Sequence, residues 1–195
     1  MKTKTICFVA LFSALLCVLA PISIPMVPVA ITLGTLGVYI IGTLLDWKRG
    51  PLVIIIYIII GGLGLPVFSS YSGGLGKLVG PTGGYILGYI LCVLLQSIIT
   101  TKYKYTKWVY PLSMIGGTAL IYLFGTTYFM VVMDGKYTIA QALLACVIPF
   151  LIGDTIKIII ASIIGIRFRK RVDTFLGIPY EKEEKNKKLL EKVKE

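Results

Sequence analysis

Asp154 and Lys157 are the two charged residues of an otherwise apolar run that extends from Ala145 to Ile166. A segment of this length and apolarity is typical of a membrane-spanning helix. Each charge at the centre of such a helix costs roughly 2.5–3.5 kcal/mol on insertion scales. A separation of three residues places both side chains on one helix face, where they can contact each other or a third group. They form either an ion pair that neutralises itself in a bundle or a binding site for a polar solute, and intramembrane ionisable residues favour the second interpretation.

The composition is that of an integral membrane protein. The chain has 195 residues, of which 56% are hydrophobic and 15% charged, and its mean hydropathy is +0.88. Its net charge of +11 comes from basic residues in short segments between apolar runs, a pattern that reports membrane topology rather than nucleic-acid binding. The sequence has no histidine, which excludes a histidine metal site or general base. We expect its four cysteines to act as small hydrophobic residues, since they lie in apolar runs without paired spacing: Cys7, Cys17, Cys92 and Cys146.

The first apolar segment begins after Met1-Lys-Thr-Lys and ends at Ala20, in the manner of a secretory signal peptide. The small residue that a cleavage site needs three positions before the cut is replaced by Val18. Leu16, before Cys17, likewise does not suit a lipoprotein signal. We therefore expect an uncleaved first transmembrane helix.

Proline, glycine and charged residues divide the chain into six apolar segments, so we predict an all-α integral membrane protein with six transmembrane helices. The segments are at about residues 5–20, 30–46, 51–63, 83–101, 108–132 and 139–166. The second and third are short, so we expect them to tilt little or to span incompletely. Residues 1–172 are the predicted membrane domain, and residues 173–195 a charged cytoplasmic tail.

Lysine and arginine are distributed unequally between the two sides of these segments. One side carries Lys2, Lys4, Lys48, Arg49, Lys102, Lys104, Lys107, Arg167, Arg169, Lys170 and Arg171. The opposite side carries Lys77 and Lys136. Basic residues are concentrated in cytoplasmic loops, so both termini are predicted to be cytoplasmic.

The most unusual stretch of the sequence is residues 61–85, in which nine residues are glycine. A flexible glycine/serine linker does not carry apolar Leu-Pro-Val-Phe, so we expect a lid or a partly re-entrant segment folded back over the bundle. Irregular backbone is tolerated at membrane depth only where it lines a cavity. The pattern G-x-x-x-x-G-K-[ST] is absent, so the chain does not hydrolyse ATP through a Walker motif.

Tyr85 and Tyr89 lie four residues apart at the start of the fourth segment, on one helix face near its outer end. Paired tyrosines there are common in the aromatic belt at the membrane interface. Tyr85 directly follows two glycines, which favours it over Tyr89 as a binding residue.

Five motifs occur in order along the chain: Ile31-Thr-Leu-Gly-Thr-Leu-Gly-Val38, Gly64-Leu-Pro-Val-Phe68, Gly73-Gly-Leu-Gly76, Gly80-Pro-Thr-Gly-Gly-Tyr85 and Pro149-Phe-x-x-Gly-Asp-x-x-Lys157. At this spacing on six segments, the chain closely resembles the BioY family, the biotin-binding membrane subunits (S components) of energy-coupling factor (ECF) transporters. The resemblance extends from about Thr3 to Arg171. One departure is Gly34, where many family members carry glutamine, so the contact of that glutamine is not carried over.

The resemblance implies a six-helix S-component fold with biotin held near the outer face, beneath the loops. It matches Asp154 and Lys157 to the family's polar ligand-binding pair. Biotin has two ureido N–H donors, a ureido carbonyl, an apolar thiophane ring and a valerate carboxylate. Asp154 can accept from the ureido N–H groups, and Lys157 can pair with the carboxylate or the ureido oxygen.

Further candidate contacts come from the glycine-rich segment and the start of the fourth helix. We expect apolar walls from Leu65, Val67 and Phe68. Glycine lets the backbone approach a ligand closely. The hydrogen-bonding and close-approach candidates are Ser70, Ser72, Gly74, Thr82, Gly83, Gly84 and Tyr85.

Ala10 and Ala14 form a small-xxx-small pattern on the first helix, which lets another helix approach closely. Internal packing explains the bare pattern equally well. The resemblance makes this pair an expected contact for the transmembrane coupling subunit.

The expected partners are biotin, the lipid bilayer of a bacterial cell membrane, the ECF coupling transmembrane subunit and two ATPase subunits. We expect no metal and no cofactor on this chain, because ATP is used only by the partner ATPases. The alternatives are an S component for another small vitamin, a stand-alone biotin facilitator, and an intramembrane enzyme. An enzyme would need a nucleophile with a base, or a metal site, yet Asp46 and Asp134 lie at loop ends and histidine is absent.

Overall fold

The structure is a computed structural model that describes residues 3–26, 28–103 and 106–178. Most of the described chain is helical, with one pair of two-residue strands. The elements in order are α1 (Thr3–Leu19), β1 (Ser23–Ile24), β2 (Ile31–Thr32), α2 (Gly34–Leu44), α3 (Arg49–Gly62), the 3₁₀ turn η1 (Ser69–Tyr71), α4 (Leu75–Val79), α5 (Gly83–Lys102), α6 (Val109–Val132), α7 (Ile139–Cys146) and α8 (Ile148–Leu176).

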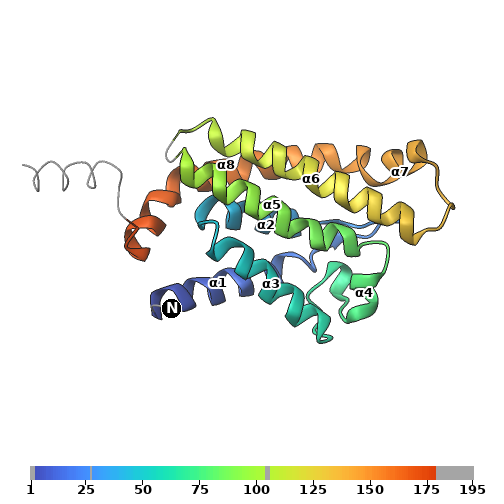
Figure 1. The fold of residues 1–195 in the computed structure, drawn as a ribbon, viewed down its shortest axis with the longest axis horizontal. Coiled ribbons are helices and arrows are strands. Elements are labelled where there is room, and N and C mark those ends of the chain that lie inside the picture. Colours follow the sequence, from blue (N-terminus) through green and yellow to red (C-terminus); the bar gives the residue numbers. More distant parts are fainter. Residues whose placement is uncertain (1–2, 27, 104–105, 179–195) are drawn as a thin grey trace, which may run out of the picture.

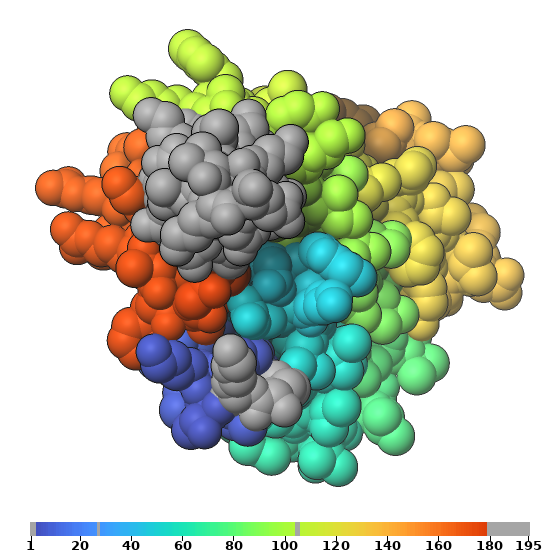
Figure 2. Space-filling view, turned by 60° about the vertical axis from the view of Figure 1, so that its left-hand side comes forward, coloured from blue at the N-terminus to red at the C-terminus, as the bar shows by residue number. Residues whose placement is uncertain are grey.

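The long helices lie side by side and run in alternating directions along the bundle (Figure 1). The start of α1, the α2–α3 connection, the α5–α6 connection and the end of α8 therefore gather at one end, seen in Figure 2. We call this the basic end, because Lys48 lies in the α2–α3 connection, Lys102 at the end of α5 and Lys107 in the α5–α6 connection. The strands, α4 and α7 occupy the opposite end, the loop end. An even number of alternating helices explains why both ends of the described chain meet at the basic end.

Helix α2 forms the centre of the bundle, packed against α1, α5 and α8. Residues 37–44 are all buried, as expected of a helix that is apolar on every side. Small residues make this packing possible. A Cβ atom at Gly42 would overlap Gln96 of α5, and one at Gly165 of α8 would overlap Thr43.

Three helical stretches are long and apolar enough to cross a membrane: Gly83–Lys102, Val109–Val132 and Ile139–Leu176. The first three predicted segments are also apolar helices, but shorter: Thr3–Leu19, Gly34–Leu44 and Arg49–Gly62. The second begins as strand β2, so its helix starts four residues later than predicted.

The prediction of a single helix over 139–166 is corrected in two respects. The segment bends between α7 and α8 at Val147, whose φ of −123° and ψ of −56° depart from helical values. Pro149 follows in the first turn of α8, where its missing N–H costs no hydrogen bond and its ring resists a continuous helix from α7. Helix α8 then continues to Leu176, where Gly177 adopts the left-handed conformation that often ends a helix. Residues 173–176 of the predicted tail are therefore helical, and residues 179–195 lie outside the described part.

The glycine-rich segment forms ordered structure at the loop end rather than an extended linker. It contains η1 and α4, and it contacts the hairpin of β1 and β2. The backbone N–H of Ser70 donates to Ser23 Oγ at 3.0 Å and to the carbonyl of Pro21 at 3.2 Å. Phe68 is buried against Tyr57 with the rings edge to face, and a Cβ at Gly61 would overlap its ring. The segment is therefore fastened both to the hairpin and to α3.

Candidate functional site

Asp154 and Lys157 lie one turn apart on α8, and their side chains form an ion pair with Nζ 2.9 Å from Oδ1. Both residues are almost fully buried, at 3% and 6% exposure. Thr35 of α2 donates its hydroxyl to Asp154 Oδ1 at 3.1 Å and accepts from Lys157 Nζ at 2.8 Å. Tyr122 of α6 donates to Asp154 Oδ2 at 2.6 Å. Three helices thus contribute to one polar network, which we call the Asp154 network.

The ion pair and hydrogen bonds of this network stabilise the buried charges of Asp154 and Lys157. The carboxylate accepts from an ammonium and two hydroxyls, and hydrogen bonds to charged groups are about twice as strong as those between neutral groups. Such geometry offsets much of the cost of burying ions, whereas removing one partner would leave the other uncompensated. The network can also exchange partners, because carboxylate, ammonium and hydroxyl groups recognise amide-like and anionic groups of a ligand.

The two charges face different cavities. Asp154 and Tyr122 line a cavity of about 320 Å³ between α6 and α8. Lys157 lines a second cavity of about 260 Å³ beneath the hairpin, together with Ser23 and Thr32. The ion pair therefore lies between two mainly apolar spaces, one between α6 and α8 and one lined by the hairpin.

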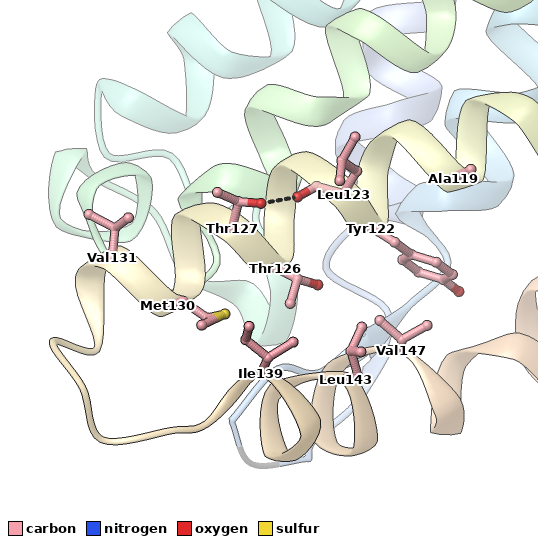
Figure 3. Close-up of a pocket in the computed structure, with 10 residues that line it drawn as sticks. All are labelled: Ala119, Tyr122, Leu123, Thr126, Thr127, Met130, Val131, Ile139, Leu143 and Val147. Carbon is pink, nitrogen blue, oxygen red and sulfur yellow. Dashed lines mark hydrogen bonds between the residues drawn. The ribbon is translucent and has the colours of Figure 1, made fainter.

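A third cavity of about 630 Å³ lies between α6 and α7, within the range of small-molecule sites, about 300–1,000 Å³. Ile139 and Leu143 of α7 point toward Thr126 and Met130 of α6 (Figure 3). Its walls are largely apolar, which suits hydrocarbon better than a charged group. Tyr122 lines this cavity as well as the α6–α8 cavity.

Tyr85 lies close to the third cavity. It is buried on α5, and its hydroxyl is 3.0 Å from Oγ1 of Thr126, which lines that cavity. Gly125 makes this contact possible, because a Cβ there would overlap the Tyr85 ring. Tyr85 thus supports the cavity wall from behind.

Gly34 lies at a crowded position where α2 begins. A Cβ there would be 3.0 Å from Thr32 Oγ1 and 3.1 Å from the hydroxyl of Tyr89, tighter than ordinary contacts. The glutamine of many family members would therefore need its surroundings to shift. The next residue, Thr35, provides the hydroxyl that bridges Asp154 and Lys157.

The loop candidates fall into two groups. Val67 and Phe68 are buried and Leu65 is exposed, and none of the three lines the cavities described above. Ser70 and Ser72 hold the loop itself, since Ser72 Oγ donates to the carbonyl of Ser69 at 2.6 Å. These residues fasten the segment over the bundle in the free protein.

The glycine candidates are packing and turn positions. A Cβ at Gly83 would overlap the carbonyl of Leu78, and one at Gly84 would overlap Tyr128. Gly74 has a φ of +92°, which strongly favours glycine. Thr82 precedes α5, and its buried hydroxyl has no hydrogen-bond partner within the part of the chain that the structure describes.

Ala10 and Ala14 both lie on the exposed face of α1. The opposite face carries buried Val9, Phe12 and Leu16, which pack into the bundle. The small-xxx-small pattern is therefore not used for packing within the described chain.

Sequence reasoning missed a second buried ion pair. Arg169 and Asp173 of α8 are each 1% exposed, with Nε 3.3 Å from Oδ2. Arg169 also donates to the carbonyls of Thr43 and Leu45 at the end of α2, at 2.5 and 3.4 Å. Arg169 belongs to a run of basic residues that indicates topology, and nothing in the sequence distinguishes it from its neighbours.

Thr35 and Tyr122 were missed as well. Both are uncharged residues on other helices, far from Asp154 in sequence. Thr35 does lie in the first of the five sequence motifs, and that position could have identified it as a candidate. Among the described residues, no three histidine, cysteine, aspartate or glutamate side chains gather as a metal ion would require.

A sequence model of the BioY family matches residues 1–174. The biotin transporter BioY of Thermotoga maritima is 36% identical over 160 residues, covering 82% of this chain and 92% of that protein. The probable biotin transporter BioY of Pyrococcus horikoshii is also 36% identical, over 87% of this chain and 98% of its own length.

The crystal structure of an S component for biotin, from an ECF-type ABC transporter, has the same fold. It superposes with a TM-score of 0.78 at 25% identity, covering 87% of this chain and 92% of that one. The helical bundle is therefore that of an S component, and its apolar helices are those of a membrane protein. These relatives are transporters or transporter components and not enzymes, as the sequence predicted. On the match of residues 1–174 and on these relatives, the chain belongs to the BioY family.

Proposed function

We propose that this protein is the biotin-binding S component of an ECF-type transporter and that the Asp154 network holds the ligand. The observation that carries the proposal is the buried Asp154–Lys157 ion pair, placed between two cavities and next to a third. Polar groups that border such spaces lie within reach of a small ligand. Relatives named as biotin transporters support biotin as the ligand.

The chemistry of biotin fits these surroundings. Its ureido group needs a strong acceptor for two N–H groups, which the Asp154 carboxylate provides. Lys157 provides a donor for the ureido oxygen or the valerate carboxylate. The thiophane ring and the hydrocarbon chain suit the mainly apolar walls between α6 and α7.

We further propose six membrane crossings, with the basic end in the cytoplasm of a bacterial cell and the loop end outside. The alternation of helices and the concentration of lysine and arginine at one end support this orientation. Biotin would then enter from the loop end, where residues of the hairpin line the Lys157 cavity. The short helices α1, α2 and α3 would tilt little and would be accommodated by local thinning of the bilayer.

Uptake against a gradient would depend on an ECF coupling subunit and two ATPase subunits, with no cofactor on this chain. The exposed Ala10–Ala14 face supports docking of the coupling subunit, since small residues let helices approach closely. Replacing both alanines with leucine is expected to abolish co-purification with the coupling subunit while leaving biotin binding unchanged. Retained co-purification would place the docking surface elsewhere.

The direct test is equilibrium binding of labelled biotin to the detergent-purified chain, compared with Asp154→Asn and Lys157→Ala. Saturable binding that falls at least about thirtyfold in both variants is expected, because each leaves a buried charge or donor uncompensated. Asp46 and Arg49 form a partly exposed ion pair of the same spacing at the basic end, so Asp46→Asn is the matched control. Absence of binding in the unmodified chain would redirect the search to other vitamins. Binding that survives both changes would reduce Asp154 and Lys157 to a structural pair.

A further inference from the structure

Tyr122 both connects and separates the spaces around Asp154. Its side chain lines the α6–α8 cavity, which contains Asp154, and also the larger α6–α7 cavity. The other residue that lines both is Ala119, which is small. In Figure 3 the Tyr122 ring lies at one end of the α6–α7 cavity, beyond Thr126 and Val147. Tyr122 is therefore the large side chain at the boundary between the two spaces.

The two oxygens of the Asp154 carboxylate are held in unequal ways. Oδ1 accepts from Lys157, which adds a charge, and from Thr35, which is fixed on the central helix α2. Oδ2 accepts from the neutral phenol of Tyr122. A bond to an ammonium is stronger than one to a neutral hydroxyl, so Oδ2 is released at lower cost.

The Asp154 side chain offers little room for a further donor while Tyr122 stays in place. Only 4% of that side chain is exposed, although a carboxylate has about four lone-pair directions. An N–H donor therefore reaches Oδ2 only when the ring and hydroxyl of Tyr122 move aside. That movement would also join the α6–α7 cavity to the space beside Asp154.

We propose that Tyr122 gates the site: its hydroxyl occupies Asp154 Oδ2 in the free protein, and a ligand N–H replaces it when the ring turns away. This inference rests on the proposed function, since it needs Asp154 to be the acceptor for the ligand. Tyr122 is then a residue that lowers affinity and slows entry, in contrast to Thr35 and Lys157, which hold the carboxylate in position.

The proposed gate predicts that removing the Tyr122 hydroxyl strengthens biotin binding instead of weakening it. Tyr122→Phe retains the ring but removes the hydroxyl that must be displaced, so the bond to Oδ2 no longer opposes entry. We expect the association rate of biotin to rise and Kd to fall by about tenfold, the typical scale of one hydrogen bond to a charged group. A tyrosine that contacts the bound ligand, or that only stabilises the fold, would give the opposite sign or no change.

The experiment measures association and dissociation of labelled biotin with the purified chain, Tyr122→Phe and Tyr137→Phe. Tyr137 packs on Phe129 beside α7 and lines neither cavity, so its variant controls for loss of a phenol near this region. A faster association in Tyr122→Phe alone supports the gate. Weaker binding, or an unchanged association rate, in Tyr122→Phe overturns it.

A second variant guards against a folding defect. Tyr122→Leu removes both hydroxyl and ring, and it should also bind faster, with folding checked by a thermal melt. If the unmodified chain does not bind biotin, the proposed function fails and the gate fails with it. If the unmodified chain binds and neither variant gains speed, the gate alone is wrong.

Discussion

Helix α8 carries two buried ion pairs that look alike locally and differ in their surroundings. Asp154–Lys157 and Arg169–Asp173 both bond to α2, the first through the Thr35 side chain and the second through backbone carbonyls at the end of α2. The first borders cavities on two sides, whereas Arg169 is enclosed by α2 and α5. The comparison teaches that burial and pairing do not by themselves identify a binding site. Open space beside the pair, which Asp154–Lys157 has and Arg169 lacks among the described residues, is what makes the first pair the candidate.

The largest effect that tests this comparison is on stability at the basic end. Arg169→Met removes the guanidinium that pairs with Asp173 and binds the carbonyls of Thr43 and Leu45. Breaking a buried ion pair in this way is expected to reduce the free energy of unfolding by about 3–5 kcal/mol. Thermal unfolding in detergent would measure the loss. A melting temperature equal to that of the unmodified chain would contradict the structural role of this pair.

A smaller effect on stability is expected when the whole pair at the loop end is replaced. The double variant Asp154→Leu with Lys157→Met exchanges two buried charges for apolar side chains, and such exchanges are often neutral or stabilising, here to within about 1 kcal/mol. Biotin binding should nevertheless be lost. A strongly destabilised double variant would show that Asp154 and Lys157 serve the fold as Arg169 and Asp173 do.

The smallest expected effects come from replacing two threonines, one in contact with each ion pair. Thr35 bridges Asp154 and Lys157, whereas Thr100 of α5 accepts from Arg169 at 3.3 Å and donates to the carbonyl of Gly42 at 3.2 Å. Valine at either position keeps the shape and removes the hydroxyl, which costs about 1 kcal/mol. Thr35→Val is expected to weaken biotin binding, and Thr100→Val to lower stability without weakening it. Equal behaviour of the two variants in binding would contradict the division.

The helical architecture was largely predictable, because the length of each apolar segment can be read directly from the sequence. All six predicted segments are helical over most of their length, and the connections between consecutive helices give the alternating arrangement. The bend at Val147 was not predicted, although Pro149 gave a local signal for it. The two-residue strands depend on pairing between β1 and β2, which no local pattern reveals.

The candidate site could be predicted from the sequence only where its residues are charged. Asp154 and Lys157 stand out because charge is costly in an apolar run. Thr35 and Tyr122 are ordinary residues of membrane helices, and only the packing of α2 and α6 against α8 brings them to the carboxylate. Arg169 is the opposite case. It is charged and looks like its basic neighbours in the sequence, and only its contacts in the folded protein bury it.

Helix α2 is bonded to α8 near both of its ends, and this double attachment limits how the protein can adapt to its bilayer. Helix α2 has 11 residues, about 16 Å of rise, shorter than a hydrocarbon core of about 30 Å. A short helix in contact with lipid is met by local thinning of the bilayer or by flanking side chains that reach its interface. Here sliding would break the Thr35 contacts and the Arg169 contacts together. Helices α2 and α8 therefore move as one unit, and because α2 is buried among its neighbours, the longer helices around it meet the lipid in its place.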